Sequence, residues 1–298
     1  MSWRTVVVSS RCKLDLKMGY MVIRGEDTKR IFLDEMALLV IENPAVSLTG
    51  CLLEALVEKK VRVVFCDGKR SPMAELSPYY GAHDSSRKIK AQLAWQDGTK
   101  GAVWTDIVSE KIRKQAELLR ELQKTEEAAL LLSYLGQIEL YDTTNREGHA
   151  AKVYFNAVFG MAFTRSADCA INAALNYGYG VLLSAFNREI TSCGYLTQLG
   201  VFHSNMFNHY NLSCDLMEPF RVLVDRRVQK MQPDSFESKE KYALWDILNQ
   251  TVLINNTSQT VLNAIKLYTH SVFDALNDND TARIRFYTWK EKQNINKT

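Results

Sequence analysis

The spacing of apolar residues changes once along this chain of 298 residues, and that change constrains its fold more than any other feature. Up to Cys66, apolar residues alternate with polar ones or form short β-branched runs, which is typical of strands. Only Cys51–Lys60 in this region has helical spacing. Beyond Ser86 the apolar residues recur about every 3.6 positions, which is typical of helices. We therefore predict an α+β protein, with a small β-rich domain containing one helix and a larger helical domain after it.

The boundary between the two parts is predicted from turn-forming residues. Arg70–Ser86 contains two of the five prolines and Gly81, a composition that favours a linker. We therefore assign residues 1–72 to the first domain, 73–88 to the linker and 89–298 to the second domain. The predicted strands are Trp3–Ser9, Lys13–Gly25 (broken at Gly19), Lys29–Leu33, Ala37–Ile41 and Val61–Cys66. The predicted helices of the second domain are Ile107–Leu122, Thr125–Leu140, Gly148–Phe163, Asp168–Glu189, Asp215–Met231 and one or two within Gln250–Ala275.

Composition bounds the class of protein but does not identify its function. The 37 Lys and Arg residues nearly balance 34 Asp and Glu residues, and a formal charge of +3 does not by itself indicate a nucleic-acid binder. The six cysteines form no C-x-x-C pair, as expected for reduced thiols in a cytoplasmic protein. No signal peptide precedes the first strand, and no apolar run approaches the roughly 18 residues of a membrane span. We expect a cytoplasmic protein with no membrane association.

Glu147 is the first candidate for chemistry. It stands at the start of a predicted helix and is followed by Gly148, Ala150 and Ala151. A carboxylate in the first turn of a helix is favoured by the helix dipole alone, so a structural role is the simpler explanation for Glu147. The local sequence does not decide between the two roles.

A second cluster, between Gly200 and Arg227, offers more. Asp215 and Glu218 are three residues apart and share one face of a helix, and His203 precedes them in a loop. Pro219 is compatible only with a first helical turn or a kink, which places Glu218 near a helix N-terminus and aims it out of the scaffold. Two carboxylates with one imidazole favour Mg²⁺ or Mn²⁺ over Zn²⁺.

Other interpretations of this cluster stay open at this point. The loop histidine could be a hydrogen-bonded structural residue, and the two carboxylates could cap the helix or pair with Arg221 or Arg226. A zinc site is also conceivable, although the spacing of its candidate ligands fits no compact zinc motif. Those candidates are Cys193, His203, His209 and Cys214.

Basic residues gather in two places that could contact DNA. One group follows Glu218 on the same predicted helix and consists of Arg226, Arg227 and Lys230. The other lies in Thr281–Thr298, where Arg283 and Arg285 are interleaved with aromatic residues, a pattern that suits phosphate contact and base stacking. A solvated terminal segment would show the same composition.

Three strings of residues in order carry a resemblance to a known family. They are Glu147-Gly148 with Ala150-Ala151 and Tyr154-Phe155; Arg165, Asp168 and Asn172–Tyr179; and Leu199-Gly200 through His203 to Asp215–Arg221. Together they resemble the CRISPR-associated integrases of family one (Cas one), over nearly the whole chain. The compact length and the Asp215–Arg221 string are most similar to the integrase of type II systems.

The resemblance implies a β-sandwich-like dimerisation domain, an α-helical catalytic domain and a divalent metal. Position by position, the implied ligands fall on Glu147, His203 and Glu218, with Asp215 as a supporting acidic residue. From Arg221, one turn beyond Glu218, we expect a contact with that carboxylate. The implied activity is that of a metal-dependent DNA endonuclease and integrase, which inserts new spacer DNA into a CRISPR array by 3′-OH transesterification in antiviral defence.

The resemblance also implies partners. These are double-stranded DNA (the prespacer and the repeat-leader), a second copy of the chain, and a small ferredoxin-like companion (Cas two) whose dimer bridges two integrase dimers. In type II systems a DNA-encircling accessory protein and the effector nuclease join them. The main alternative is a non-catalytic DNA-end-binding assembly subunit of the same complex, in which the acidic residues are structural.

Overall fold

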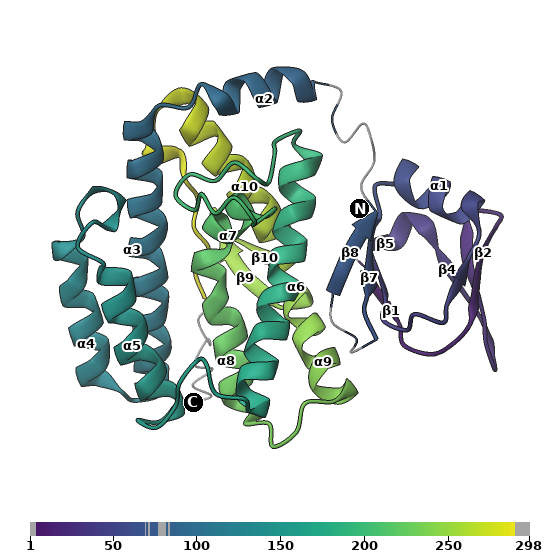
Figure 1. Ribbon diagram of the computed structural model, residues 1–298, viewed down its shortest axis with the longest axis horizontal. Coiled ribbons are helices and arrows are strands. Elements are labelled where there is room, and N and C mark those ends of the chain that lie inside the picture. The colour runs from purple at the N-terminus through teal and green to yellow at the C-terminus, as the bar shows by residue number, and fades with distance from the viewer. Residues whose placement is uncertain (1–3, 69, 71, 77–81, 83, 290–298) are drawn as a thin grey trace, which may run out of the picture. The chain divides into compact units, whose positions relative to one another are not determined.

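The computed structural model describes residues 4–289 apart from 69, 71, 77–81 and 83, and the chain divides into two compact units between Gly81 and Ala82 (Figure 1). The first unit is built of strands and the second mainly of helices. This confirms the predicted α+β class and the order of its two parts. No helix in the described part of the chain is long and apolar enough to cross a membrane.

The first unit consists of two four-stranded sheets with a shared core. One sheet has the order β1-β5-β7-β8 and the other the order β4-β3-β2-β6. The helix α1 (Gly50–Glu58) packs against β2 and β7, and Thr49 caps its N-terminus by accepting a bond from the Leu52 amide. The strands are β1 Arg4–Val8, β2 Lys13–Lys17, β3 Tyr20–Arg24, β4 Thr28–Phe32, β5 Met36–Ile41, β6 Ser47–Leu48, β7 Arg62–Cys66 and β8 Pro72–Leu76.

Two sequence predictions for this unit need correction. Lys13–Gly25 is a hairpin, because Met18 and Gly19 both take positive φ (50° and 78°) and turn the chain between β2 and β3. Pro72–Leu76 is not linker but strand β8, which pairs antiparallel with β7. A proline at the first position of an edge strand disturbs no ladder, so its presence was a weak signal against a strand.

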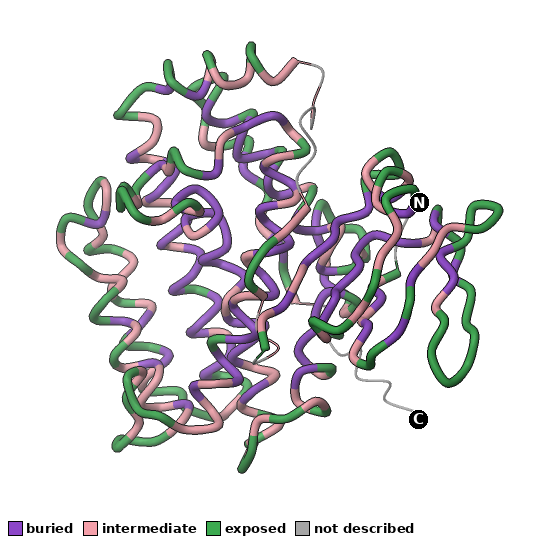
Figure 2. Tube along the Cα trace, turned by 45° about the vertical axis from the view of Figure 1, so that its right-hand side comes forward, coloured by how far each residue is buried: buried purple, intermediate pink, exposed green. Residues whose placement is uncertain are grey.

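The second unit is a helical body in which the long helices α3 (Asp97–Glu121) and α6 (Ala170–Ser192) are largely buried. Figure 2 shows buried residues gathered in its interior and exposed ones along its outer turns and loops. The other helices are α2 Ser85–Leu93, α4 Thr125–Tyr134, α5 Arg146–Phe159, α7 Asn211–Met217, α8 Arg221–Met231, α9 Ser238–Trp245 and α10 Val261–Asp278. Short 3₁₀ turns are η2 Leu135–Gln137, η3 Leu140–Asp142, η4 Glu218–Phe220, η5 Asp246–Asn249 and η6 Thr281–Arg283.

The second unit differs from the predicted all-α domain at one place. Strands β9 (Thr251–Ile254) and β10 (Thr257–Thr260) form an antiparallel hairpin before α10. Asn255 and Asn256 both have positive φ and make its two-residue turn. The β-branched residues of Thr251–Ile254 and the Asn255-Asn256 pair after them favour a strand and a turn, so the prediction of helices over the whole of Gln250–Ala275 is wrong here.

The predicted helix Asp215–Met231 is split at Pro219, one of the two outcomes that the proline allowed. Helix α7 ends at Met217, η4 contains Glu218 and Pro219, and α8 begins at Arg221. The break matters because it turns Glu218 into the interior of the unit, where its side chain is 5% exposed. The expectation that Glu218 aims out of the scaffold is therefore wrong.

Candidate metal and DNA site

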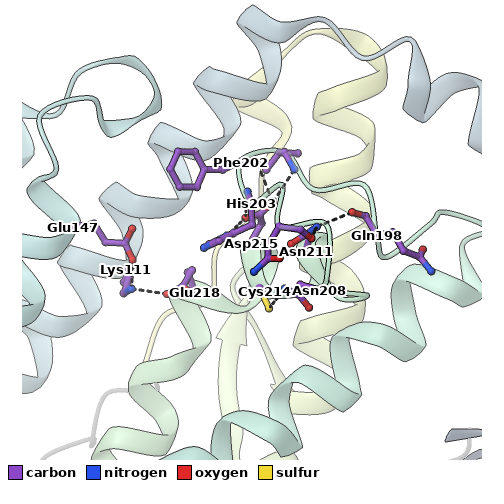
Figure 3. A network of polar contacts seen from close by, with 12 residues as sticks. Lys111, Glu147, Gln198, Phe202, His203, Asn208, Asn211, Cys214, Asp215 and Glu218 are labelled. Carbon is purple, nitrogen blue, oxygen red and sulfur yellow. Dashed lines mark hydrogen bonds and ion pairs between the residues drawn. The ribbon is translucent and has the colours of Figure 1, made fainter. Parts of the chain in front are cut away.

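Glu147 and Glu218 meet on a single cation, the ammonium of Lys111. Glu147 lies in the first turn of α5, Glu218 in η4, and Lys111 just past the middle of α3. The Lys111 Nζ lies 2.5 Å from Glu218 Oε2 and also contacts Glu147 Oε1 (Figure 3). The two glutamates are more than 70 positions apart in the sequence and are thereby brought to one point, which no local pattern could show.

The start of α5 is fixed by Asp142, so Glu147 is held in place. The Asp142 carboxylate accepts hydrogen bonds from the backbone amides of Arg146 and Glu147, at 2.8 and 2.9 Å. These are two of the amides that a helix leaves without intrahelical partners, and a carboxylate also suits the helix dipole. Sequence reasoning did not single out Asp142.

Glu218 is held on its other side by Arg221. The Arg221 Nε lies 2.9 Å from Glu218 Oε1, which is the contact expected from the sequence. Burial by itself raises the pKa of Glu218, but Lys111 and Arg221 outweigh burial, so its pKa lies below the ordinary value. For Lys111, burial lowers the pKa while Glu218 and Glu147 raise it, and the net pKa is above the ordinary value. The glutamate is therefore ionised and the lysine charged at neutral pH.

His203 is oriented by Asp215, which is completely buried. The Nδ1 of His203 contacts Asp215 Oδ1, and the same carboxylate accepts from the amides of Val201, Phe202 and His203 at 2.7, 3.0 and 3.1 Å. The hydrogen bond with Asp215 raises the pKa of His203, and the charges of Glu218 and Glu147 raise it further. Because Nδ1 is engaged with a carboxylate, Nε2 is the ring nitrogen left for another partner.

The loop of His203 is also anchored through Trp104 on α3. The Trp104 ring is completely buried and stacks on Phe202, with centroids 4.3 Å apart and planes 5° apart. The His203 and Trp104 rings meet nearly at right angles, with their centroids 5.6 Å apart. Helix α3 thus supports both the imidazole, through Trp104, and the carboxylates, through Lys111. Neither residue was singled out from the sequence.

The sequence did contain a signal for Lys111. Trp104, Ile107 and Val108 form the apolar face of α3, and Lys111 follows at the next helical step on that face. All four are buried. A lysine on an apolar face needs a buried carboxylate as partner, so its position indicated an ion pair whose other members could not be named.

Behind Glu218, a buried Asp225 ties three helices together. Asp225 on α8 accepts from the Tyr154 hydroxyl of α5 at 2.9 Å and from the Tyr179 hydroxyl of α6 at 2.5 Å. The Arg221 guanidinium lies 4.7 Å from the centroid of the Tyr179 ring. This network fixes α5, which carries Glu147, relative to the segment that carries Glu218.

We expect Asp225→Asn to remove a pH-dependent loss of folding stability. Burial raises the pKa of Asp225 from an ordinary 3.8 to about 6, although the two tyrosine hydrogen bonds oppose the shift. Because the folded pKa is raised, the favourable contribution of this group is complete below pH 3.8 and is lost as the pH rises through 6, a cost of about 3 kcal/mol above both values.

The measurement for Asp225→Asn is the free energy of unfolding at pH 5 and pH 8. Relative to wild type, the variant gains about 1 kcal/mol more at pH 8 than at pH 5, whatever it loses at both by weakening the tyrosine contacts. Asp246→Asn, on the surface beside Arg227, is the control for the loss of a single carboxylate. An equal effect at both pH values for Asp225→Asn would contradict the prediction.

The predicted DNA-binding residues lie on the surface in ion pairs or in contact with the chain itself. Arg226 and Lys230 both pair with Glu121, at 2.7 and 3.0 Å, and Arg227 pairs with Asp246 at 3.2 Å. Arg283 pairs with Asp278 at 3.1 Å, and Arg285 donates to the Ala282 carbonyl oxygen. The phosphates of DNA would have to compete with these carboxylates and this carbonyl oxygen for the basic side chains.

One aromatic residue of the C-terminal pattern, Tyr287, is not available for base stacking. Tyr287 is completely buried, packs on Phe220 with centroids 4.7 Å apart, and donates to the Pro219 carbonyl oxygen at 3.2 Å. Trp289 lies under the Arg226 guanidinium at 4.6 Å. The stacking interpretation is therefore wrong for Tyr287, which belongs to the core behind Glu218. Residues 290–298 lie outside the described part.

The zinc alternative finds no support. Among the described residues, no three His, Cys, Asp or Glu side chains form a ready-made metal cluster. Cys193 lies 3.3 Å from His270, and Cys214 accepts from Asn208, so these thiols have other partners than His203. Glu147 and Glu218 do converge, but the ammonium of Lys111 stands between them.

The sequence is similar to one family of known proteins. The family model "CRISPR associated protein Cas1" matches residues 5–266. A CRISPR-associated endonuclease Cas1 from Neisseria meningitidis serogroup C is 36% identical over 229 residues, which are 76% of this chain and 75% of that one.

Two solved structures share the fold. A casposase bound to integration product superposes with a TM-score of 0.75 at 17% identity, over 94% of this chain and 92% of that chain. A Cas6-RT-Cas1–Cas2 complex superposes with a TM-score of 0.73 at 17% identity, over 97% of this chain but only 36% of that longer chain. On the match to the family model and to the Neisseria relative, the chain belongs to the Cas1 (Cas one) family of CRISPR-associated proteins.

Proposed function

We propose that this chain is a divalent-metal-dependent DNA endonuclease and integrase, which inserts new spacer DNA into a CRISPR array. The observation that carries the proposal is the convergence of Glu147 and Glu218 on one cation, beside a histidine oriented by a buried aspartate. Membership of the Cas1 family supports it, as does the likeness in fold to a casposase whose structure holds an integration product.

In the proposed site Glu147, Glu218 and the free nitrogen of His203 hold Mg²⁺ or Mn²⁺. Two features support such an ion: two carboxylates already share a cation, and the imidazole is fixed by a carboxylate, as metal-bound histidines are. When bound, the ion supplies a Lewis acid that neutralises charge on the reacting phosphate. Arg221 keeps Glu218 oriented, and Asp215 keeps the proton of His203 on Nδ1.

The proposed reaction is a transesterification. The 3′-oxygen of the incoming strand forms a bond to a phosphorus of the repeat, and the bond from that phosphorus to its own 3′-oxygen breaks. One proton leaves the attacking hydroxyl and one is gained by the released 3′-oxygen, so no external energy source is needed. The chain contributes alignment and charge stabilisation and forms no covalent intermediate.

The partners follow from family membership. We propose that the chain acts as a homodimer on double-stranded DNA together with a Cas two companion, and a Cas1–Cas2 complex is among the solved structures of similar fold. A type II setting, with its DNA-encircling accessory protein and effector nuclease, and a cytoplasmic location belong to the same proposal.

The test is strand transfer of a short duplex into a plasmid that carries a repeat. With the companion protein and Mn²⁺ or Mg²⁺, we expect joined products from duplexes with 3′-OH ends and none from duplexes with 3′-deoxy ends. A chelator abolishes the products. The alternative, a non-catalytic DNA-end-binding subunit, predicts DNA binding that the chelator leaves unchanged and no product with either metal. That result would overturn the proposed function.

A further inference from the structure

Lys111 has a role that neither the family strings nor the candidate ligands assign. It is 8% exposed, and its ammonium contacts both glutamates of the site. Resting on the proposed function, we propose that Lys111 is a displaceable counter-ion: it neutralises Glu147 and Glu218 until a divalent cation takes its place, and its released ammonium then binds a phosphate of the DNA.

The charges of the site favour this exchange. Glu147 and Glu218 carry two negative charges, and Lys111 and Arg221 supply two positive ones. A divalent cation between the same carboxylates would lie next to the Lys111 ammonium, and burial strengthens the repulsion between them. The two cations therefore compete for one pair of carboxylates.

Lys111 is the cation of this pair that is free to leave. Arg221 is held by Glu218 at 2.9 Å and is stacked over Tyr179, a ring whose hydroxyl is bound to Asp225. The Lys111 ammonium is held by the two glutamates and, in the described part of the chain, by no aromatic ring. Its flexible four-carbon stem lets the charge move by several ångströms. A phosphate drawn to the loaded site is a suitable new partner for the ammonium.

A permanent structural ion pair would be the simpler role, and metal affinity separates the two. We would titrate metal-free protein with Mn²⁺ and follow free Mn²⁺ by electron paramagnetic resonance. Lys111→Met removes the charge at similar length, and we expect it to bind Mn²⁺ at least tenfold more tightly than wild type. Lys100→Met is the matched control on the same helix, because Lys100 pairs with the exposed Asp97, and its affinity is unchanged.

Equal or weaker Mn²⁺ binding by folded Lys111→Met would overturn the proposal. If the variant does not fold without metal, its melting temperature is measured with and without Mn²⁺. Because Mn²⁺ can replace a displaceable counter-ion, we expect it to raise the melting temperature of the variant more than that of wild type. No rescue by Mn²⁺ would show a structural lysine instead. If wild type itself binds no Mn²⁺, that result overturns the proposed metal-dependent function, whatever the variant does.

The phosphate contact has a separate readout. The affinity for a duplex with 3′-dideoxy ends, which cannot react, is measured against salt concentration. In Mn²⁺ we expect the slope of log affinity against log salt to be shallower by about 1 in Lys111→Met than in wild type, because one phosphate contact is lost. In chelator the two slopes agree, since Lys111 is then engaged with the glutamates. Equal slopes in Mn²⁺ would overturn this half of the proposal.

Discussion

Glu218→Gln lowers strand transfer by about 10²–10³-fold, because it removes one of the two carboxylates on which the site is built. The substitution keeps the size of the side chain and changes its charge. It leaves Lys111 with Glu147 alone and Arg221 without its carboxylate, and a buried cation that loses its partner is unfavourable. We therefore expect lower stability as well, and the assay belongs well below the melting temperature.

The measurement is the initial rate of product formation with the companion protein at saturating Mn²⁺. Glu126→Gln, in the exposed first turn of α4, is the matched control and keeps the wild-type rate. Circular dichroism checks that both variants are folded. A folded Glu218→Gln protein with the wild-type rate would remove Glu218 from the catalytic site.

Gly200→Ala lowers strand transfer by about 100-fold, through the position of His203. A Cβ at Gly200 would lie 2.4 Å from the His203 carbonyl oxygen and 2.6 Å from Asp215 Oδ2. Neither neighbour can retreat easily, since the first is backbone and the second is a buried carboxylate held by three amides. The loop must move, and partners that orient a metal-binding histidine are typically worth 10–100-fold.

Gly180→Ala is the control for this variant. Gly180 lies in α6, and nothing lies within 4 Å of a Cβ placed there. Because glycine inside a helix is less favourable than alanine by roughly 0.5–1 kcal/mol, this change should raise the melting temperature slightly and leave the rate unchanged. Strand transfer by Gly200→Ala within threefold of wild type would show that the loop does not depend on this close approach.

The sequence predicted much of the fold because the relevant signals are local. Alternation identified the strands of the first unit, and helical spacing identified α3, α5 and α6. The errors arose where one local signal masked another. Pro72 and its neighbours resembled a linker, whereas pairing with β7 makes them a strand. The hairpin Thr251–Thr260 was absorbed into a helix although its asparagines favour a turn.

The interpretation of charged residues was less successful, because charge alone does not reveal a partner. Arg226 and Lys230 suggested a DNA surface, but both pair with Glu121, which is distant from them in the sequence. Asp225 directly precedes Arg226 in the sequence, yet it is buried between two tyrosine hydroxyls. The predicted DNA-binding roles stay predictions.

By itself the sequence determined the two-part α+β organisation, a helix start close to Glu147 and a first turn or kink at Pro219, since each depends on residues within a few positions of one another. Only the tertiary structure decided that Glu147 and Glu218 meet and that Lys111 lies between them. It also decided that Asp215 binds His203 instead of capping a helix. The physical reason is that burial and pairing of charge depend on neighbours contributed by segments distant in the sequence, and these neighbours exist only once α3, α5, α7 and η4 have packed together.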